Sequence, residues 1–156
     1  MLFAQGYPDQ ALARMREALA YARELAHPYT VAYALSVACI LHGRHRPGRD
    51  ARTEAETLTV LAAEQGFPLP AAVGTVAAGW VLTHEGSADE GITLMQRGLA
   101  DYTATGAELW VPDLLALLAQ GHARAGRPAA GLDLLADALD RVGGTLARGR
   151  AAPAPG

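Results

Sequence analysis

Four segments of the chain repeat one pattern of small and bulky residues at a constant spacing of 40 residues, beginning at Gly6, Arg46, Gly86 and Gly126. In most units a small residue is followed by a bulkier apolar one and then by another small one. The aligned positions are Ala11, Ala51, Gly91 and Gly131; Met15, Ala55, Met95 and Leu135; and Ala18, Leu58, Gly98 and Ala138. Small residues let helices approach closely, and the larger residues fill the space beside them. The pattern therefore predicts a solenoid of stacked helix pairs.

Proline and glycine mark the expected helix boundaries. Pro28, Pro70 and Pro112 stand at or just before apolar periodic segments, where a proline fits the first helical turn. Short turns that contain glycine or proline separate these segments. The predicted helices cover residues 8–26, 29–44, 48–65, 70–85, 88–104, 112–125 and 128–142. The sequence thus predicts an all-α fold with seven helices and no strand.

The ends of the chain define its predicted domain organisation. Residues 1–142 are expected to form one repeat array, in which a partial first repeat precedes three helix pairs. Gly143 and Gly144 are expected to end the last helix, and residues 143–156 are expected to form a disordered tail. Neither end carries the polar face of a capping repeat, so we expect a section of a longer array, with self-association through the uncapped ends.

Composition narrows the choice of partner and compartment. A net charge of −3 gives no electrostatic case for nucleic acid, and the apolar runs are too short to span a membrane. The N-terminus has no basic segment leading into an apolar one. Cys39, the single cysteine, cannot form an internal disulfide. We therefore expect a cytoplasmic protein that binds neither nucleic acid nor membrane.

The residues at the packing positions resemble those of the tetratricopeptide repeat (TPR), notably Ala11, Met15 and Ala18 after the turn at Gly6. The usual unit has about 34 residues, so a longer unit implies longer helices or loops. The stretches GYPDQALARMREALAYARELAHP, AAEQGFPLP and DEGITLMQRGLADYTATGAEL are similar to the C-terminal repeat region of large bacterial multidomain regulators. In that family a nucleotide cyclase or DNA-binding domain and a signalling ATPase domain precede the repeats. The resemblance implies a TPR-like right-handed solenoid of stacked antiparallel helix pairs over 1–142, and it carries over no catalytic or DNA-binding activity.

Motifs for catalysis or cofactor binding are missing from the sequence. It contains no GxxxxGK[ST], GxGxxG, HExxH or paired CxxC motif. Cys39, His42 and His45 have a spacing that could place ligands on one helical face, but a fourth ligand is missing and residues 43–48 are typical of a turn. His42 and His122 share one repeat position and are expected at the edge of the core. We therefore predict no metal, no cofactor and no enzymatic activity.

The family resemblance places the first helix of each pair on the concave side of the solenoid, where equal repeat positions would form rows along a groove. The rows are Tyr33, Val73 and Asp113; Ser36, Val76 and Ala116; Ile40, Trp80 and Gln120; and Arg44, His84 and Arg124. An aromatic row beside a basic row would suit an extended peptide or a partner helix with an acidic edge. Alternatively, Trp80 packs against a missing neighbour and the arginines are ordinary cations at helix ends.

The predicted function is a non-enzymatic interaction module that binds a protein or peptide segment in this groove, as part of a bacterial signalling or transcriptional regulator. The alternative is a repeat segment that senses an effector and controls an attached ATPase or nucleotide cyclase through the stacking of its repeats. That alternative requires a closed polar pocket, and no cluster in the sequence requires one.

Overall fold

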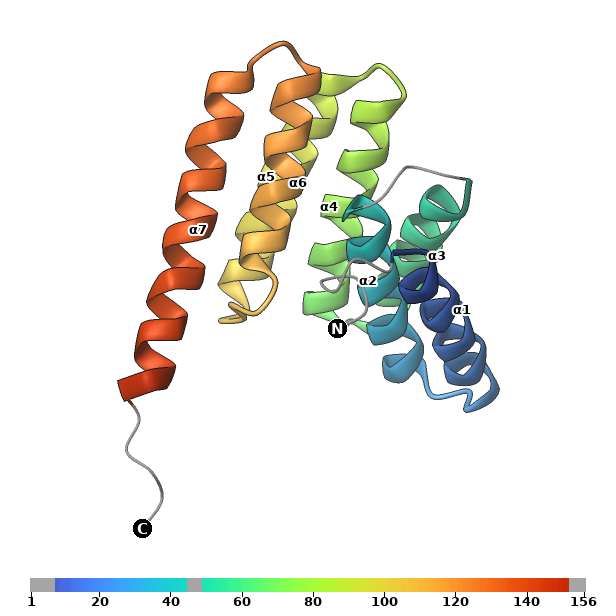
Figure 1. Ribbon diagram of the computed structural model, residues 1–156. Helices are drawn as coiled ribbons and strands as arrows, with labels where there is room; N and C mark the ends of the chain where they lie inside the picture. Colours follow the sequence, from blue (N-terminus) through green and yellow to red (C-terminus); the bar gives the residue numbers. More distant parts are fainter. Residues whose placement is uncertain (1–7, 45–48, 152–156) are drawn as a thin grey trace.

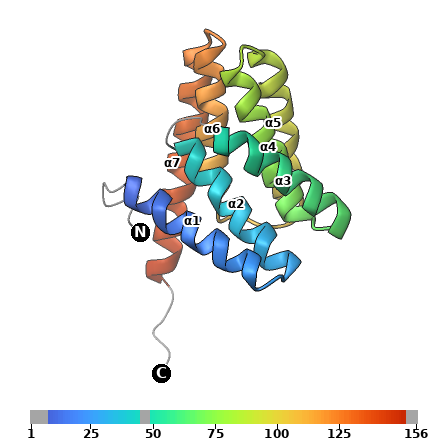
Figure 2. The ribbon, with the colours of Figure 1, turned by 90° about the vertical axis from the view of Figure 1, so that its right-hand side faces the viewer.

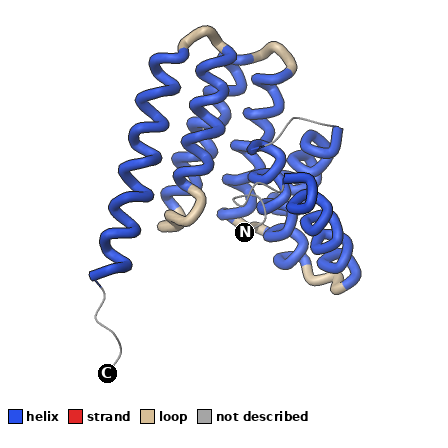
Figure 3. The backbone as a smooth tube through the Cα atoms, in the orientation of Figure 1, coloured by secondary structure: helices blue, strands red, loops and turns tan. Residues whose placement is uncertain are grey.

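The computed structural model describes residues 8–44 and 49–151, with side chains for 9–43 and 50–143. Within these ranges the chain forms helices and turns and no strand (Figures 1 and 3). The helices are α1 (Pro8–Glu24), α2 (Pro28–Arg44), α3 (Arg49–Gln65), α4 (Pro68–His84), α5 (Ala88–Ala104), α6 (Val111–Arg124) and α7 (Pro128–Ala151). The all-α prediction is confirmed, and none of these helices is both long and apolar enough to cross a membrane.

Each 40-residue unit consists of two halves of 20 residues, each a helix followed by a tight turn. Where a turn is described, the backbone has a positive φ at one position of each half, namely at Ala26, Gly66, Gly86, Gly106 and Gly126. A left-handed residue after a helix reverses the chain direction, and glycine adopts that conformation without strain. Consecutive helices therefore run antiparallel (Figure 3). The equivalent position 46 lies outside the described residues.

The helices are arranged in two layers (Figures 1 and 2). The even-numbered helices form the inner layer, in which α4 contacts both α2 and α6, and α2 also contacts α6. In the outer layer, α3 packs against α2 and α4, and α5 packs against α4 and α6. Among the described residues, α1 packs against α2 and also pairs Arg16 with Asp50 of α3 over 3.4 Å, and α7 packs against α6. The fold is a helical solenoid of stacked antiparallel pairs, and its two outermost helices each leave one flank uncovered.

Glycine permits the closest helix contacts. A Cβ atom added to Gly91 of α5 would lie 2.5 Å from the carbonyl oxygen of Gly79 on α4, and one added to Gly79 would lie 2.6 Å from that of Gly91. A Cβ on Gly131 would lie 2.9 Å from the carbonyl oxygen of Ala119. The predicted close-approach position is therefore confirmed at Gly91 and Gly131.

The largest difference from the predicted helix boundaries is at the C-terminus. Helix α7 continues to Ala151, so the prediction that Gly143 and Gly144 end it is wrong. Gly143 has no neighbouring atom within 4 Å of an added Cβ, so its place in the helix comes from local hydrogen bonding rather than from packing. Residues 152–156 of the predicted tail, and 1–7 of the predicted array, lie outside the described residues.

Candidate functional site

The predicted row of Ile40, Trp80 and Gln120 is brought together on the inner layer. Trp80 Nε1 donates to Gln120 Oε1 over 3.4 Å, and Gln120 Nε2 donates to the carbonyl oxygen of Gly43 over 3.4 Å. These bonds connect α4, α6 and α2. Trp80 is only 2 % exposed and Ile40 is also buried. These two side chains therefore contact the protein's own core and are not available to a partner in this structure.

In the row that begins at Ser36, Ser36 and Val76 are buried and Ala116 is partly buried. Ser36 is inaccessible to solvent, and its Oγ donates to the carbonyl oxygen of Ala32 over 2.8 Å. Val76 is buried against α5, where a Cβ on Gly98 would lie 2.7 Å from its Cγ2 atom. Both residues serve packing between helices.

The row that begins at Tyr33 reaches the surface beside an aromatic cluster that the sequence analysis missed. Tyr33 is 46 % exposed, and its ring centroid lies 5.6 Å from that of Trp110. Tyr102 accepts a hydrogen bond from the Trp110 backbone N–H, 3.3 Å from its hydroxyl oxygen. Asp113 is partly buried. The aromatic residues have no constant repeat spacing, so periodicity alone could not indicate this cluster.

The row that was predicted to be basic consists of Arg44, His84 and Arg124. Its described side chains do not form a set of three aligned cations. The side chain of Arg44 lies outside the described residues, and Arg124 is exposed. The His84 ring lies 4.3 Å from that of Trp80, and its Nδ1 atom lies 2.9 Å from the Trp80 carbonyl oxygen. Burial lowers the pKa of His84 below 6.5, and the charge of Arg124 lowers it further. His84 therefore carries less positive charge near neutral pH than a histidine exposed to water.

A cavity of about 250 Å³ opens between α3 and α4, away from the predicted rows. Its lining is mainly apolar, with charged groups at the rim. The lining residues are Arg52, Ala55, Glu56, Thr59, Ala78, Val81 and Leu82. A hollow of this kind, with few polar groups placed at its entrance, is typical of small-ligand sites.

The cavity exists because the second unit carries small or polar residues where the other units carry bulky apolar ones. The three positions are Arg52, Ala55 and Thr59 on α3. Their equivalents are Leu12, Met15 and Leu19; Ile92, Met95 and Leu99; and Leu132, Leu135 and Leu139. In the first and third units, large side chains occupy the equivalent space. All of these side chains are buried except Leu99, which is partly buried. Comparison of the units over their full length would have indicated the site from the sequence.

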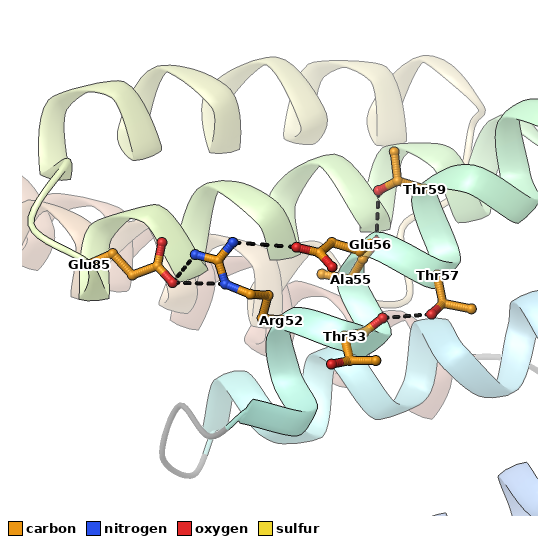
Figure 4. Close-up of polar contacts among 7 residues, drawn as sticks. All are labelled: Arg52, Thr53, Ala55, Glu56, Thr57, Thr59 and Glu85. Carbon is orange, nitrogen blue, oxygen red and sulfur yellow. Dashed lines mark hydrogen bonds and ion pairs between the residues drawn. The ribbon is translucent and has the colours of Figure 1, made fainter.

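Two carboxylates hold Arg52 at the rim of the cavity (Figure 4). Its Nε atom donates to Glu85 Oε1 over 3.0 Å, and its Nη2 atom pairs with the same oxygen. Its Nη1 atom donates to Glu56 Oε1 over 3.4 Å. Hydrogen bonding to Glu85 raises the pKa of Arg52. Arg52 and Glu56 line the cavity, and Glu85 pairs with Arg52 next to it, so the three groups together carry a net charge of −1.

A second exposed feature is an apolar stripe on α7, formed by Leu132, Leu135, Leu139 and Val142. Leu132 is 67 % exposed and Leu139 is 72 % exposed. Spacings of three, four and three residues place the four side chains along one side of the helix, as in the seam of a coiled coil. We call this set the α7 stripe. Its equivalents on α1 and most of those on α5 are buried, whereas no helix among the described residues covers this side of α7.

Buried titratable residues also occur between α2 and α3. His42 Nε2 lies 3.0 Å from Glu54 Oε2, and neither atom has another hydrogen-bond partner. Burial, together with the negative charge of Glu54, raises the pKa of the Cys39 thiol. A buried, protonated thiol is a poor nucleophile. Across the described part of the chain, no group of three or more His, Cys, Asp and Glu residues is placed to hold a metal ion.

Comparisons of the chain with family models, curated proteins and solved structures return no match.

Proposed function

We propose that this chain is a non-enzymatic, TPR-like interaction module that binds a helix of a protein partner along the α7 stripe. The stripe is the observation that carries the proposal, because it is a contiguous apolar surface on a folded element. The resemblance of the sequence to the repeat region of bacterial signalling regulators agrees with this function. We propose that the module acts in the cytoplasm.

The repeat itself specifies the chemistry of the partner. On α5, the positions equivalent to Leu132 and Leu135 are Ile92 and Met95, which are covered by α6. A Cβ on Gly121 of α6 would lie 2.6 Å from Met95 Cε and 3.3 Å from Ile92 Cγ1. The covering helix therefore presents a small residue to the bulky ones. We infer that the partner contributes an apolar helix with small residues at its contact face, in the place that a following repeat would occupy.

The experiment uses a fluorescent peptide with the sequence of α6 as a stand-in for such a helix, because α6 presents Gly121 to Ile92 and Met95 of α5. Binding to the full chain is measured by anisotropy. The double variant Leu132→Glu/Leu139→Glu should weaken binding more than about tenfold, because it places charges in the apolar contact. Val60→Glu is the matched control, since Val60 is an exposed apolar residue on α3, and it should leave binding unchanged.

Other outcomes would contradict the proposal. Equal binding by the double variant and the wild type would exclude the α7 stripe as the contact surface. The absence of any binding would also count against it. Sedimentation that shows a wild-type dimer, dissociated by the double variant, would identify a second copy of this chain as the occupant instead.

A further inference from the structure

We propose that the cavity between α3 and α4 is a binding site for a small aliphatic amine, bound with its hydrocarbon chain inside and its ammonium group at the rim. The inference is independent of the α7 stripe. It rests on the shape of the cavity, its apolar walls and the charges at its entrance.

The walls suit a short hydrocarbon chain. Ala55 and Val81 are buried, and Ala78 and Leu82 are partly buried on the facing side. The hydroxyl of Thr59 donates to the carbonyl oxygen of Ala55 over 2.8 Å, so it does not require a partner from a ligand. The hollow of about 250 Å³ is open to solvent on one side, so a small molecule can enter it. A linear chain would cover apolar surface that the bulky residues cover in the first and third units.

The rim selects the charge of the ligand. Glu56 and Glu85 both face the Arg52 guanidinium, so the three groups sum to a charge of −1. An ammonium group has three donors and could bond both carboxylates through their remaining lone pairs. An anion would compete with Glu85 for Arg52 and would lie beside two carboxylates, which is electrostatically unfavourable. The site therefore favours a cation over an anion of equal length.

The position of Arg52 favours a small free molecule over a side chain of a partner protein. Figure 4 shows its guanidinium between Glu56 on α3 and Glu85 at the end of α4. This bridge lies at the rim, so the ligand must pass beside it. A free amine has no attached backbone to place against the bridge. Such a ligand would contact both α3 and α4, which gives the effector-sensing alternative a defined starting point.

The experiment compares n-pentylammonium, pentanoate and 1-pentanol by nuclear magnetic resonance titration of the full chain. Pentylammonium should shift amide signals of α3 and α4 and bind at least about fivefold more tightly than the other two probes. Shorter alkylammonium ions should bind about fourfold more weakly for each methylene removed. Glu56→Gln and Glu85→Gln should each weaken the binding of the cation about threefold or more, and Glu64→Gln, an exposed change on α3, should not.

Filling the cavity provides the decisive variant. Ala55→Met introduces the residue found at the equivalent positions 15 and 95, and Thr59→Leu introduces the residue found at 19, 99 and 139. Either variant should abolish binding of pentylammonium, while Ala63→Met, at an exposed position of the same helix, should retain it. Equal or tighter binding of pentanoate or pentanol would overturn the proposal. So would undiminished binding by both filled variants, or shifts confined to helices other than α3 and α4.

Discussion

At the scale of single residues, equivalent positions in different units of this chain can be compared directly. The buried pair of His42 and Glu54 lies between α2 and α3. The next unit carries Leu82 and Leu94 at the same two positions. An isolated buried charge is strongly unfavourable, whereas two apolar side chains of similar volume often replace a buried pair without loss. We therefore expect the pair to add little net stability compared with two apolar side chains.

The double variant His42→Leu/Glu54→Leu should keep the free energy of unfolding within about 1 kcal/mol of the wild type, or raise it. His42→Leu alone should lower it by about 3 kcal/mol, because Glu54 would remain buried without its partner. Urea unfolding followed by circular dichroism measures both. Equal losses in the single and double variants would show that the packing shape, rather than the pairing, is responsible.

Ala26 provides a second comparison between units. It has a φ of 50°, where the other described turns have glycine. A left-handed conformation costs a residue with a Cβ about 1–2 kcal/mol, part of which glycine loses again through unfolded-state entropy. Ala26→Gly should therefore raise the free energy of unfolding by about 1 kcal/mol. Ala20→Gly, in the exposed interior of α1, should lower it by a similar amount, and thermal melting distinguishes the two signs.

At the scale of helices, the sequence contained most of what determines their position. Proline at a helix start and glycine at its end act locally, so the predicted boundaries of α1 to α6 agree with the structure to within about two residues. The prediction that Gly143 and Gly144 end α7 was wrong because a glycine inside a helix lowers its stability without ending it. No left-handed turn follows Gly143. Local patterns therefore predict where helices can stop, and not whether they do.

The two kinds of helical glycine should respond in opposite ways to the same change. Gly91→Ala should destabilise the protein by about 1–3 kcal/mol, because the added Cβ would meet the backbone of α4. Gly143→Ala should stabilise it by about 0.5–1 kcal/mol, since it raises helix propensity and meets nothing. Denaturant unfolding of both variants provides the measurement. A neutral Gly91→Ala would contradict the close approach of α4 and α5.

At the scale of the whole molecule, the burial of Trp80 could not be predicted from the sequence. Its repeat position and its neighbour Gln120 were correctly aligned by the 40-residue spacing. Its accessibility depends on how strongly the inner layer curves, and that curvature brings α2 against α6. Small rotations between units accumulate along a solenoid. A one-dimensional pattern specifies which residues share a row, but not whether the row is open.

Acid should destabilise the folded chain through its histidines. Burial lowers the pKa of both His84 and His122 below 6.5. Between the folded and unfolded pKa values the unfolded chain binds more protons, so the free energy of unfolding falls as the pH falls through that range. The melting temperature should thus decrease from about pH 7.5 to about pH 5.5. His84→Gln/His122→Gln should reduce this decrease, and an unchanged slope would assign it to other groups.

The contact between α2 and α6 has a mechanical consequence. Most solenoids extend like springs under tension, since each unit touches only its neighbours. Here the hydrogen bond from Gln120 to Gly43, and the packing of Leu117 against Gly43, connect units that are not adjacent. A pulling force applied to the ends would first detach α1 and α7, because each of them packs against a single helix and α1 adds only one exposed ion pair to α3. The central helices α2 to α6 would then resist the force and unfold together in one cooperative step.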